Sequence, residues 1–212
     1  MKLNELGTHS ERGAVQDPRY YDEAPVIQGD VSLHARYFTY KTEAGLVAGD
    51  NFSVMFTIDQ PRKEVWPYFR DFNLWQSFYY SGVVGDLEGK PLRLSTSPNE
   101  PGPCQYIVRK VIPEHLIVLD QPVPEPGYQG LRWWLGGVSA GFHVFMLSEN
   151  TGKTIVTVLM NHASVMERAS QRQEMTDEEA TRPWRELVLD GMSTWRDDFI
   201  PRLRRVVKEG KR

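Results

Sequence analysis

Residues 51–76 read NFSVMFTIDQPRKEVWPYFRDFNLWQ, and this stretch decides the fold that we expect. Apolar and polar residues alternate as far as Asp59, as in a strand that buries one of its faces. Pro61 suits the first turn of a helix, and the apolar residues of 65–69 fall on one helical face. The stretch therefore predicts a strand followed directly by a short amphipathic helix, with a second short helix or turn at 72–80.

Strand signals continue on both sides of that stretch. Before it, residues 33–41 predict an edge strand. After it, residues 104–121 predict a hairpin that turns at Pro113-Glu114, and residues 141–164 predict a hairpin that turns at ENTG. Strands that follow one another in this way pair with their neighbours, so we expect an antiparallel sheet.

The last predicted element is a long helix that begins near 177 or 182 and ends near 208. Thr176 and Glu179 form a capping box at its start. Pro201 predicts a kink, because proline has no N–H and its ring clashes with the preceding turn. Apolar residues recur at helical spacing and form one buried stripe: Trp184, Leu187, Val188, Gly191, Trp195, Phe199, Leu203 and Val206.

The bulk composition is that of a globular protein. The chain has 212 residues, of which 40% are hydrophobic and 25% are charged. A net charge of -3 gives no reason to expect nucleic acid, and no segment is apolar and long enough for membrane insertion. The single cysteine, Cys104, excludes an internal disulfide, and the N-terminus has no signal core, so we expect a cytoplasmic protein. We expect residues 1–35 to be an N-terminal extension and residues 36–212 to be a single domain.

The order of these elements resembles the helix-grip superfamily of START and birch-pollen-allergen proteins, also called SRPBCC. The resemblance covers about residues 50–208. It implies an α+β fold in which a curved antiparallel β-sheet wraps around a long C-terminal helix, with two short helices after the first core strand and an internal cavity. The stretches that carry it are FSVMFTIDQPRKEVWPYFRDFNLW, VRKVIPEHLIVLD, GKTIVTVLM and WRDDFIPRLRRVV.

The superfamily holds proteins of several functions. It includes lipid carriers, polyketide aromatase/cyclases, plant hormone receptors, the catalytic domains of ring hydroxylases, and chaperone activators. The chain shows no iron-binding or Rieske cysteine/histidine motif, which argues against the hydroxylase branch. The resemblance therefore implies a protein that holds a hydrophobic ligand, and it implies no cofactor.

The first hairpin brings together an arginine and an aspartate. If Pro113 and Glu114 form the turn, position 109 faces 118 and position 107 faces 120, so Arg109 and Asp120 are diagonal neighbours on one face. The family pattern suggests that this is the concave face. There Arg109 could anchor a carboxylate or phenolate, with Asp120 steering it. The alternative is a slip of one residue, which would turn both side chains outward.

The second hairpin places two histidines on an otherwise apolar face. If 148 pairs with 153, His162 lies near position 139 and about 13 Å from His143, at about 3.3 Å per residue. Two ligands so far apart cannot share one zinc ion, so we predict no metal site. His143 alone is a candidate proton donor or base. The alternative is a histidine of the core or of the cavity rim.

Aromatic residues gather in two further stretches that would line and gate the cavity. They offer flat apolar surfaces and fixed tyrosyl donors to a flat or steroid-like ligand, and the alternative is packing in the core or rim. The candidate ligand-binding residues are Trp75, Tyr79, Tyr80, Trp133, Trp134, His162 and, on the helix, Gly191 and Trp195.

These features favour a protein that binds a hydrophobic, aromatic or polycyclic small molecule in an internal cavity. As an enzyme it would be a cofactor-independent cyclase, aromatase or lyase, with Arg109, Asp120 and His143 as catalytic residues and positioning as its main contribution. The alternatives are a non-catalytic carrier of lipids or isoprenoids and an interaction module of the chaperone-activator type. The unpaired edge at 33–41 could pair with a second copy, giving a homodimer, or with the N-terminal arm.

Overall fold

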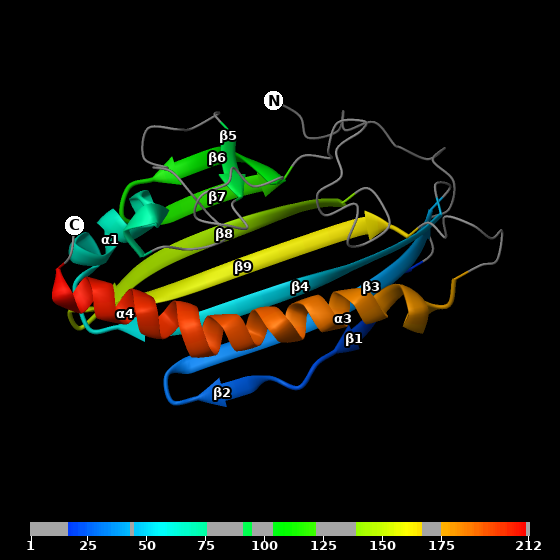
Figure 1. Cartoon of the computed structure of the whole chain (residues 1–212), viewed down its shortest axis with the longest axis horizontal. Helices are drawn as coiled ribbons and strands as arrows, with labels where there is room; N and C mark the ends of the chain where they lie inside the picture. The colour runs from blue at the N-terminus through cyan, green and yellow to red at the C-terminus, as the bar shows by residue number, and fades with distance from the viewer. Residues whose placement is uncertain are drawn as a thin grey trace, which may run out of the picture.

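The computed structural model describes residues 17–42, 45–75, 91–94, 104–121, 139–166 and 175–210. In these residues, nine strands form one antiparallel sheet, and a long helix lies along it (Figure 1). The strands are β1 (Arg19–Asp22), β2 (Val26–Gln28), β3 (Val31–Thr42), β4 (Gly45–Ile58), β5 (Pro91–Leu94), β6 (Cys104–Ile112), β7 (Leu116–Gln121), β8 (Ser139–Asn150) and β9 (Lys153–Val165).

The strand order is β1-β3-β4-β9-β8-β7-β6-β5, and β2 also pairs with β3. The sheet is curved, and the C-terminal helix covers one of its faces (Figure 1). We call the face that carries this helix the inner face and the opposite face the outer face. The α+β helix-grip architecture expected from the sequence is thereby confirmed. No helix among the described residues is long and apolar enough to span a membrane.

The stretch on which the prediction depended folds as expected. On β4, alternate residues are buried on the inner face, including Phe52, Val54 and Phe56. The strand ends at Ile58, and Pro61 precedes helix α1 (Arg62–Arg70). A 3₁₀ turn, η1 (Phe72–Trp75), follows α1. Periodicity and a proline at the helix start were sufficient to predict this order of elements.

The N-terminal chain closes one edge of the sheet. Strands β1 and β2 both pair with β3. The sequence left two partners open for this edge, the N-terminal arm and a second copy, and the N-terminal arm is the one that occupies it. The boundary that we expected at residue 36 falls within β3. Arg19 and Glu23 also form ion pairs with Asp177 and Arg185 on the long helix, at 2.5 and 2.8 Å. The beginning of the chain is therefore tied both to the sheet and to the helix.

The C-terminal helix consists of α3 (Asp177–Thr194), a π-helical turn η2 (Trp195–Phe199) and α4 (Ile200–Glu209). Thr176 and Glu179 form the capping box predicted at its start. The π-helical turn comes directly before Pro201, where the ring removes a backbone donor and a regular α-helical turn cannot be completed. The irregularity therefore lies where the proline predicted one.

The helix packs on the inner face through aromatic side chains. Trp195 contacts Phe56 of β4 at 6.4 Å and Phe199 at 5.3 Å, measured between ring centroids. At the same end of the sheet, Phe69 of α1 and Phe72 of η1 pack against Phe145 of β8 at 6.1 and 5.4 Å. These contacts hold the helix and α1 to the same end of the sheet.

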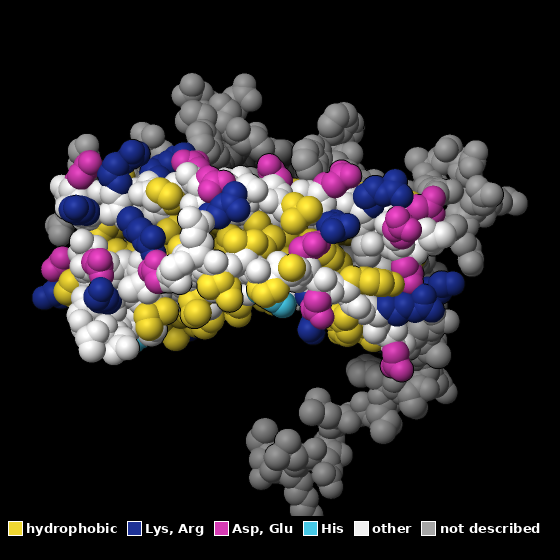
Figure 2. Space-filling view, turned by 90° about the horizontal axis from the view of Figure 1, so that it is seen from below, with side chains coloured by type: hydrophobic (Ala, Val, Ile, Leu, Met, Phe, Trp, Pro, Cys, Tyr) yellow, Lys and Arg dark blue, Asp and Glu magenta, His cyan; other side chains and the backbone are white. Residues whose placement is uncertain are grey.

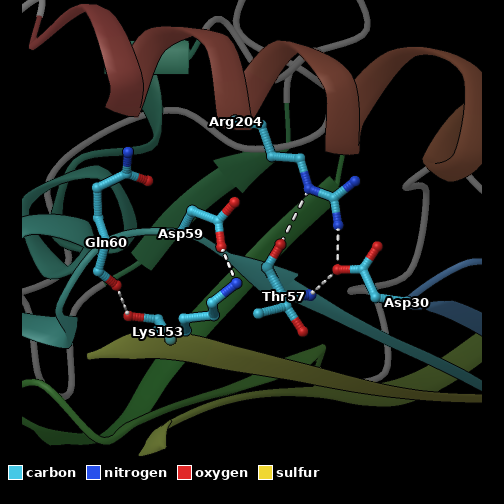
Figure 3. Close-up of polar contacts among 7 residues, drawn as sticks. Asp30, Thr57, Asp59, Gln60, Lys153 and Arg204 are labelled. Atoms are coloured by element: carbon cyan, nitrogen blue, oxygen red, sulfur yellow. Dashed lines mark hydrogen bonds and ion pairs between the residues drawn. The ribbon is translucent and has the colours of Figure 1, made fainter. Parts of the chain in front are cut away.

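A polar clamp joins α4 to the ends of the strands (Figure 3). Arg204 donates one hydrogen bond to the carbonyl of Thr57, at 2.9 Å, and another to Oδ2 of Asp30, at 2.6 Å. The N–H of Thr57 donates to the same Asp30 oxygen at 3.0 Å. Nearby, Lys153 pairs with Asp59 at 2.6 Å. The Arg204 clamp therefore ties the turn before β3, the end of β4 and the helix together.

We expect the substitution Asp30→Asn to lower the free energy of unfolding at pH 7 by about 1 kcal/mol, because both partners stay partly exposed. Partial burial alone would raise the pKa of the Asp30 carboxyl, but Arg204 and the Thr57 N–H outweigh it and hold that pKa below its ordinary value. Stability from the carboxylate is therefore present at neutral pH and lost as the pH falls below about 4.

Urea denaturation at several pH values measures this difference between the wild type and Asp30→Asn. Asp59→Asn is the matched control, since it removes a more exposed ion pair at the same end of the sheet and should change stability by less than about 0.5 kcal/mol. The role assigned to the Asp30 charge would be contradicted if the free energies of unfolding of the wild type and Asp30→Asn differed by the same amount from neutral to strongly acidic pH.

Candidate functional site

A row of polar side chains crosses the inner face of the sheet. Tyr37 of β3 pairs with Asp50 of β4, Asp50 pairs with His162 of β9, and His162 pairs with Gly141 of β8. Residues paired across antiparallel strands point to the same face, so these positions lie side by side. His143 is two residues beyond Gly141 on β8 and shares its face. The sheet therefore gathers two imidazoles and a carboxylate at one place.

These three side chains form a hydrogen-bonded chain. Nδ1 of His162 lies 3.0 Å from Oδ1 of Asp50, and its Nε2 lies 2.7 Å from Nε2 of His143. Asp50 is only 1% exposed and His143 only 5% exposed. Buried ionisable groups are costly unless they are paired, so the three side chains depend on one another. We call Asp50, His162 and His143 the histidine relay.

The turn of the second hairpin brings the two histidines into contact. Position 150 pairs with 153 across a two-residue turn in which Thr151 and Gly152 both have positive φ, 50° and 76°. The four-residue turn expected from the sequence is therefore wrong, and β9 is shifted by two residues along β8. His162 lies opposite Gly141 instead of position 139, so the predicted separation of about 13 Å from His143 is also wrong.

Gly141 makes room for the relay. A Cβ at this position would lie 2.9 Å from Cδ2 of His162 and 2.3 Å from the carbonyl oxygen of Asn161. Real Cβ atoms do not approach so closely, so any larger residue would displace β9 or the imidazole. Gly49 approaches from the other side, where a Cβ would lie 2.1 Å from the carbonyl oxygen of His162. Glycines on both neighbouring strands therefore allow β9 to carry the imidazole in this position.

Helix α3 covers the relay with Trp184. Its indole stacks on the His162 ring, with ring centroids 6.2 Å apart and an interplanar angle of 18°. Within the described residues, the buried Trp184 N–H has no hydrogen-bond partner, and the buried Tyr37 hydroxyl lies beside Glu23. Burial, followed by the charge of Glu23, raises the pKa of Tyr37, so this hydroxyl remains a donor. Unpaired buried donors are rare in proteins and often mark functional sites.

The electrostatics of the relay favour one mobile proton. Burial, and then the neighbouring His162, lower the pKa of His143 well below its ordinary value of 6.5, so His143 stays neutral. When Nδ1–H of His162 donates to ionised Asp50, a single hydrogen lies between the two Nε2 atoms. The carboxylate of Asp50 holds the His162 ring in this orientation. The relay can therefore take up a proton at one imidazole and pass it to the other.

The predicted pair of Arg109 and Asp120 does form, but on the outer face. Nε of Arg109 donates to Oδ2 of Asp120 at 2.9 Å, and the two side chains are 52% and 36% exposed. The inner positions of these strands are Val108, Val111, Ile117 and Leu119. The expected placement on the concave face is therefore wrong, and the catalytic role expected for the pair stays a prediction.

The length of the first hairpin turn explains why Arg109 and Asp120 lie on the outer face. The turn of the first hairpin has three residues, so Ile112 pairs with Leu116 and not with position 115. A β-bulge between Val108 and Lys110 then restores the predicted pairing of Ile107 with Asp120. The extra residue in the bulge is Arg109, and its side chain turns outward.

The two helix residues predicted to bind a ligand have different surroundings. Trp195 is buried in aromatic packing with Phe56 and Phe199, as a core residue would be. Gly191 lies on the same inward stripe, and a Cβ there would meet no atom within 4 Å. There is therefore open space beside the helix at Gly191.

The remaining predicted ligand contacts cannot be placed. The main chain of Trp75 is in η1, but its side chain lies outside the described part of the structure. Tyr79, Tyr80, Trp133 and Trp134 also lie outside the described residues. Their expected contacts with a ligand stay predictions.

Sequence reasoning missed Asp50, Trp184, Tyr37 and Gly141. Asp50 left a signal, because it follows Ala48 and precedes Phe52 at the alternating positions of β4 that face the core. A carboxylate at such a position requires a buried partner. The predicted distance between His143 and His162, which was the argument against a shared metal ion, is not correct. The described residues contain no group of three or more His, Cys, Asp or Glu side chains that could hold a metal ion.

Comparisons with known proteins add structural matches only. No protein-family model matches the chain, and no curated protein matches it. CalU16 from Micromonospora echinospora matches with 16% identity over 89% of this chain and 94% of that chain, with a TM-score of 0.38. DynU16, a putative protein in the dynemicin biosynthetic locus, matches with 20% identity over 75% of this chain and 47% of that chain, with a TM-score of 0.46.

Norcoclaurine synthase from Thalictrum flavum, in complex with dopamine and hydroxybenzaldehyde, matches with 14% identity over 78% of this chain and 90% of that chain, with a TM-score of 0.48. At these identities and TM-scores, no activity can be carried over to this chain. The helix-grip assignment therefore rests on the strand order and the C-terminal helix of the chain itself.

The histidine relay predicts a pH-dependent stability. Below pH 6.5 the unfolded chain protonates His143 and the folded chain does not, so the unfolded state binds more protons. The free energy of unfolding should then fall with decreasing pH, by at most about 1.4 kcal/mol per pH unit from this residue. His143→Gln should reduce this slope, as measured by urea denaturation between about pH 7 and pH 5.

His34→Gln is the matched control, because His34 lies on the outer side of β3, away from the relay. This variant should keep the pH slope of the wild type. Equal slopes for the wild type and His143→Gln would show that His143 is not held neutral in the folded protein.

Proposed function

We propose that the protein binds a hydrophobic, aromatic small molecule against the inner face of its sheet and catalyses a proton-transfer step on it without a cofactor. The histidine relay would supply the acid and base, with Asp50 orienting His162. The step belongs to the class that begins ring closure, aromatisation or carbon–carbon cleavage, in which a hydrogen next to a carbonyl is removed. The relay itself carries the proposal.

The surroundings of the relay support this function. His143 shares its row with Phe52, Met160 and Leu119, so the polar chain lies within an apolar face. Burying ionisable groups in such a place opposes folding unless it serves another purpose. Titratable groups whose pKa is displaced by burial and by a specific neighbour are frequent in active sites.

The space beside Gly191 supports a bound ligand. Trp184 rests on His162 and Trp195 rests on Phe56, and the buried Val188 and Met192 lie on the helix between these two contacts. Gly191 lies between these two contacts on the same stripe, where a side chain would normally fill the gap. The relay lies near one end of this interval, within reach of a molecule held under the helix.

The geometry supports a defined order of proton movements. The Asp50 carboxylate holds Nδ1–H of His162, so that Nε2 of His162 faces Nε2 of His143 as an acceptor. A proton taken from the substrate at one imidazole can pass to the other, because the two Nε2 atoms lie 2.7 Å apart. The return of that proton to another atom of the substrate would complete an isomerisation or dehydration with no net change in the relay.

The proposed chemistry can be tested with 2-tetralone, a hydrophobic aryl ketone with acidic hydrogens next to its carbonyl. The wild type should accelerate exchange of these hydrogens for deuterium, followed by NMR. Asp50→Asn should lower the exchange rate about 100-fold, because a general base loses its orienting carboxylate. His34→Gln is the matched control and should leave the rate unchanged, since His34 lies on the outer side of β3, away from the relay.

Two outcomes would oppose the proposal. Equal rates for the wild type and Asp50→Asn would exclude the relay as the base. Retention of the ketone in native mass spectrometry without any exchange would instead favour a carrier that binds its ligand and performs no chemistry.

The ligand space can be tested separately through Gly191. Gly191→Ala should raise the free energy of unfolding by about 0.5–1 kcal/mol, because alanine favours a helix and the added methyl group meets no neighbour. Gly191→Phe should instead fill the space and weaken binding of the dye 8-anilinonaphthalene-1-sulfonate at least about tenfold in fluorescence titrations. Undiminished dye binding by Gly191→Phe would place the ligand elsewhere.

A further inference from the structure

Strand β8 is apolar on both of its faces along much of its length. On β8, His143, Phe145 and Leu147 point to the inner face, while Phe142 and Val144 point outward between them. An antiparallel sheet that faces water on one side normally shows polar residues there. Strands that are apolar throughout are typical of sheets covered on both sides. The sequence of β8 therefore fits a sheet whose outer face is also covered.

The outward apolar residues form one continuous surface. Leu159, Val144 and Val118 pair in a single row across β9, β8 and β7. Four larger side chains are substantially exposed, with Met55 at 47%, Phe142 and Ile112 at 43%, and Leu159 at 37%. Single exposed apolar residues are common, but a continuous group marks an interaction site. The outer patch consists of Met55, Ile112, Val118, Phe142, Val144 and Leu159.

The helices do not cover this surface. Helices α3 and α4 lie on the inner face, in front of the sheet in Figure 1. In Figure 2 the helix side of the molecule faces up, and hydrophobic side chains lie exposed along the left and middle part of the lower side, with charged side chains towards the right. Among the described residues, no helix covers the outer patch, and four of its side chains are exposed.

The charges around the outer patch indicate what kind of partner fits. On one flank Arg109 pairs with Asp120, and on the other Arg36 pairs with Asp22. Lys110, which pairs with Val118, adds a second positive side chain to the first flank, so both flanks carry both signs. A nucleic acid or an anionic membrane would require a predominantly positive rim, whereas the described residues of this rim carry both signs. A surface whose two flanks both carry both signs is complementary to a copy of itself, because a two-fold axis brings opposite charges together.

We propose that a second copy of this chain binds the outer patch, so that the protein is a homodimer joined through the outer faces of its sheets. Homodimer interfaces are about 65% apolar at their core and bury about 800 Å² per partner or more. An apolar patch across β4 and β6 to β9 with a mixed-charge rim is the kind of surface that such an interface requires. The dimer leaves both inner faces and both helices directed outward, and its existence does not depend on the function proposed above.

The dimer is tested by sedimentation equilibrium or by light scattering after size exclusion, from about 1 µM to about 200 µM protein. The wild type should have twice the chain mass of 24.4 kDa. Phe142→Arg and Leu159→Arg place a charge in the middle of the outer patch and should each give the mass of one chain. Leu189→Arg is the matched control: Leu189 is a similarly exposed apolar residue, but it lies on α3 and should not affect the dimer.

Circular dichroism melting checks that the variants fold. A mass of one chain for the wild type at every concentration would overturn the proposal, and so would dimers of Phe142→Arg and Leu159→Arg as stable as the wild-type dimer. Binding of a monomeric wild type to phosphatidylcholine vesicles, lost in Phe142→Arg, would also overturn it and assign the patch to a lipid surface. Deuterium exchange in 2-tetralone is independent of these results, so failure of the dimer and failure of the catalytic function can be told apart.

Discussion

The pairing register of β8 on β9 is the constraint on which the rest of the structure depends. Side chains alternate between the two faces of a strand, so a slip by one residue would exchange the inner and outer sets. The positive φ angles of Thr151 and Gly152 fix the register by closing a two-residue turn. The same register places His143 against His162 on one face and Val144 beside Leu159 on the other. One turn thus determines both the relay and the outer patch.

Local rules were sufficient for much of the fold. The alternation in β4, the proline before α1 and the cap at Thr176 each act over a few residues, and each led to the correct element. The hairpin turns were harder to predict, because turns of different length are close in energy. The sequence of a turn does not exclude a turn that is slightly longer or shorter. In the first hairpin Glu114 adopts positive φ, which is uncommon for glutamate. No local signal marks the bulge that turns Arg109 outward.

The candidate site shows the same division between local and distant information. Asp50 is recognisable from its strand alone, because it interrupts a run of core positions. Its partner is not, since the pairing of Asp50 with His162 joins residues 112 positions apart in the chain. Trp184 looked like one more member of an apolar stripe, and only the packing of α3 shows that its ring rests on an imidazole. A sequence can therefore reveal a buried polar residue before it reveals what that residue does.

The ties between the two ends of the chain have a consequence for the order in which the protein is made. Arg19 contacts Asp177, 158 residues later, and Asp30 contacts Arg204, 174 residues later. During synthesis β1 to β3 leave the ribosome long before the helix that holds them, at roughly 5–20 residues per second. Contacts so distant in sequence also slow folding, since long loops must close first. The nascent chain therefore spends many seconds with its first strands unprotected, a period in which a chaperone has the most to contribute.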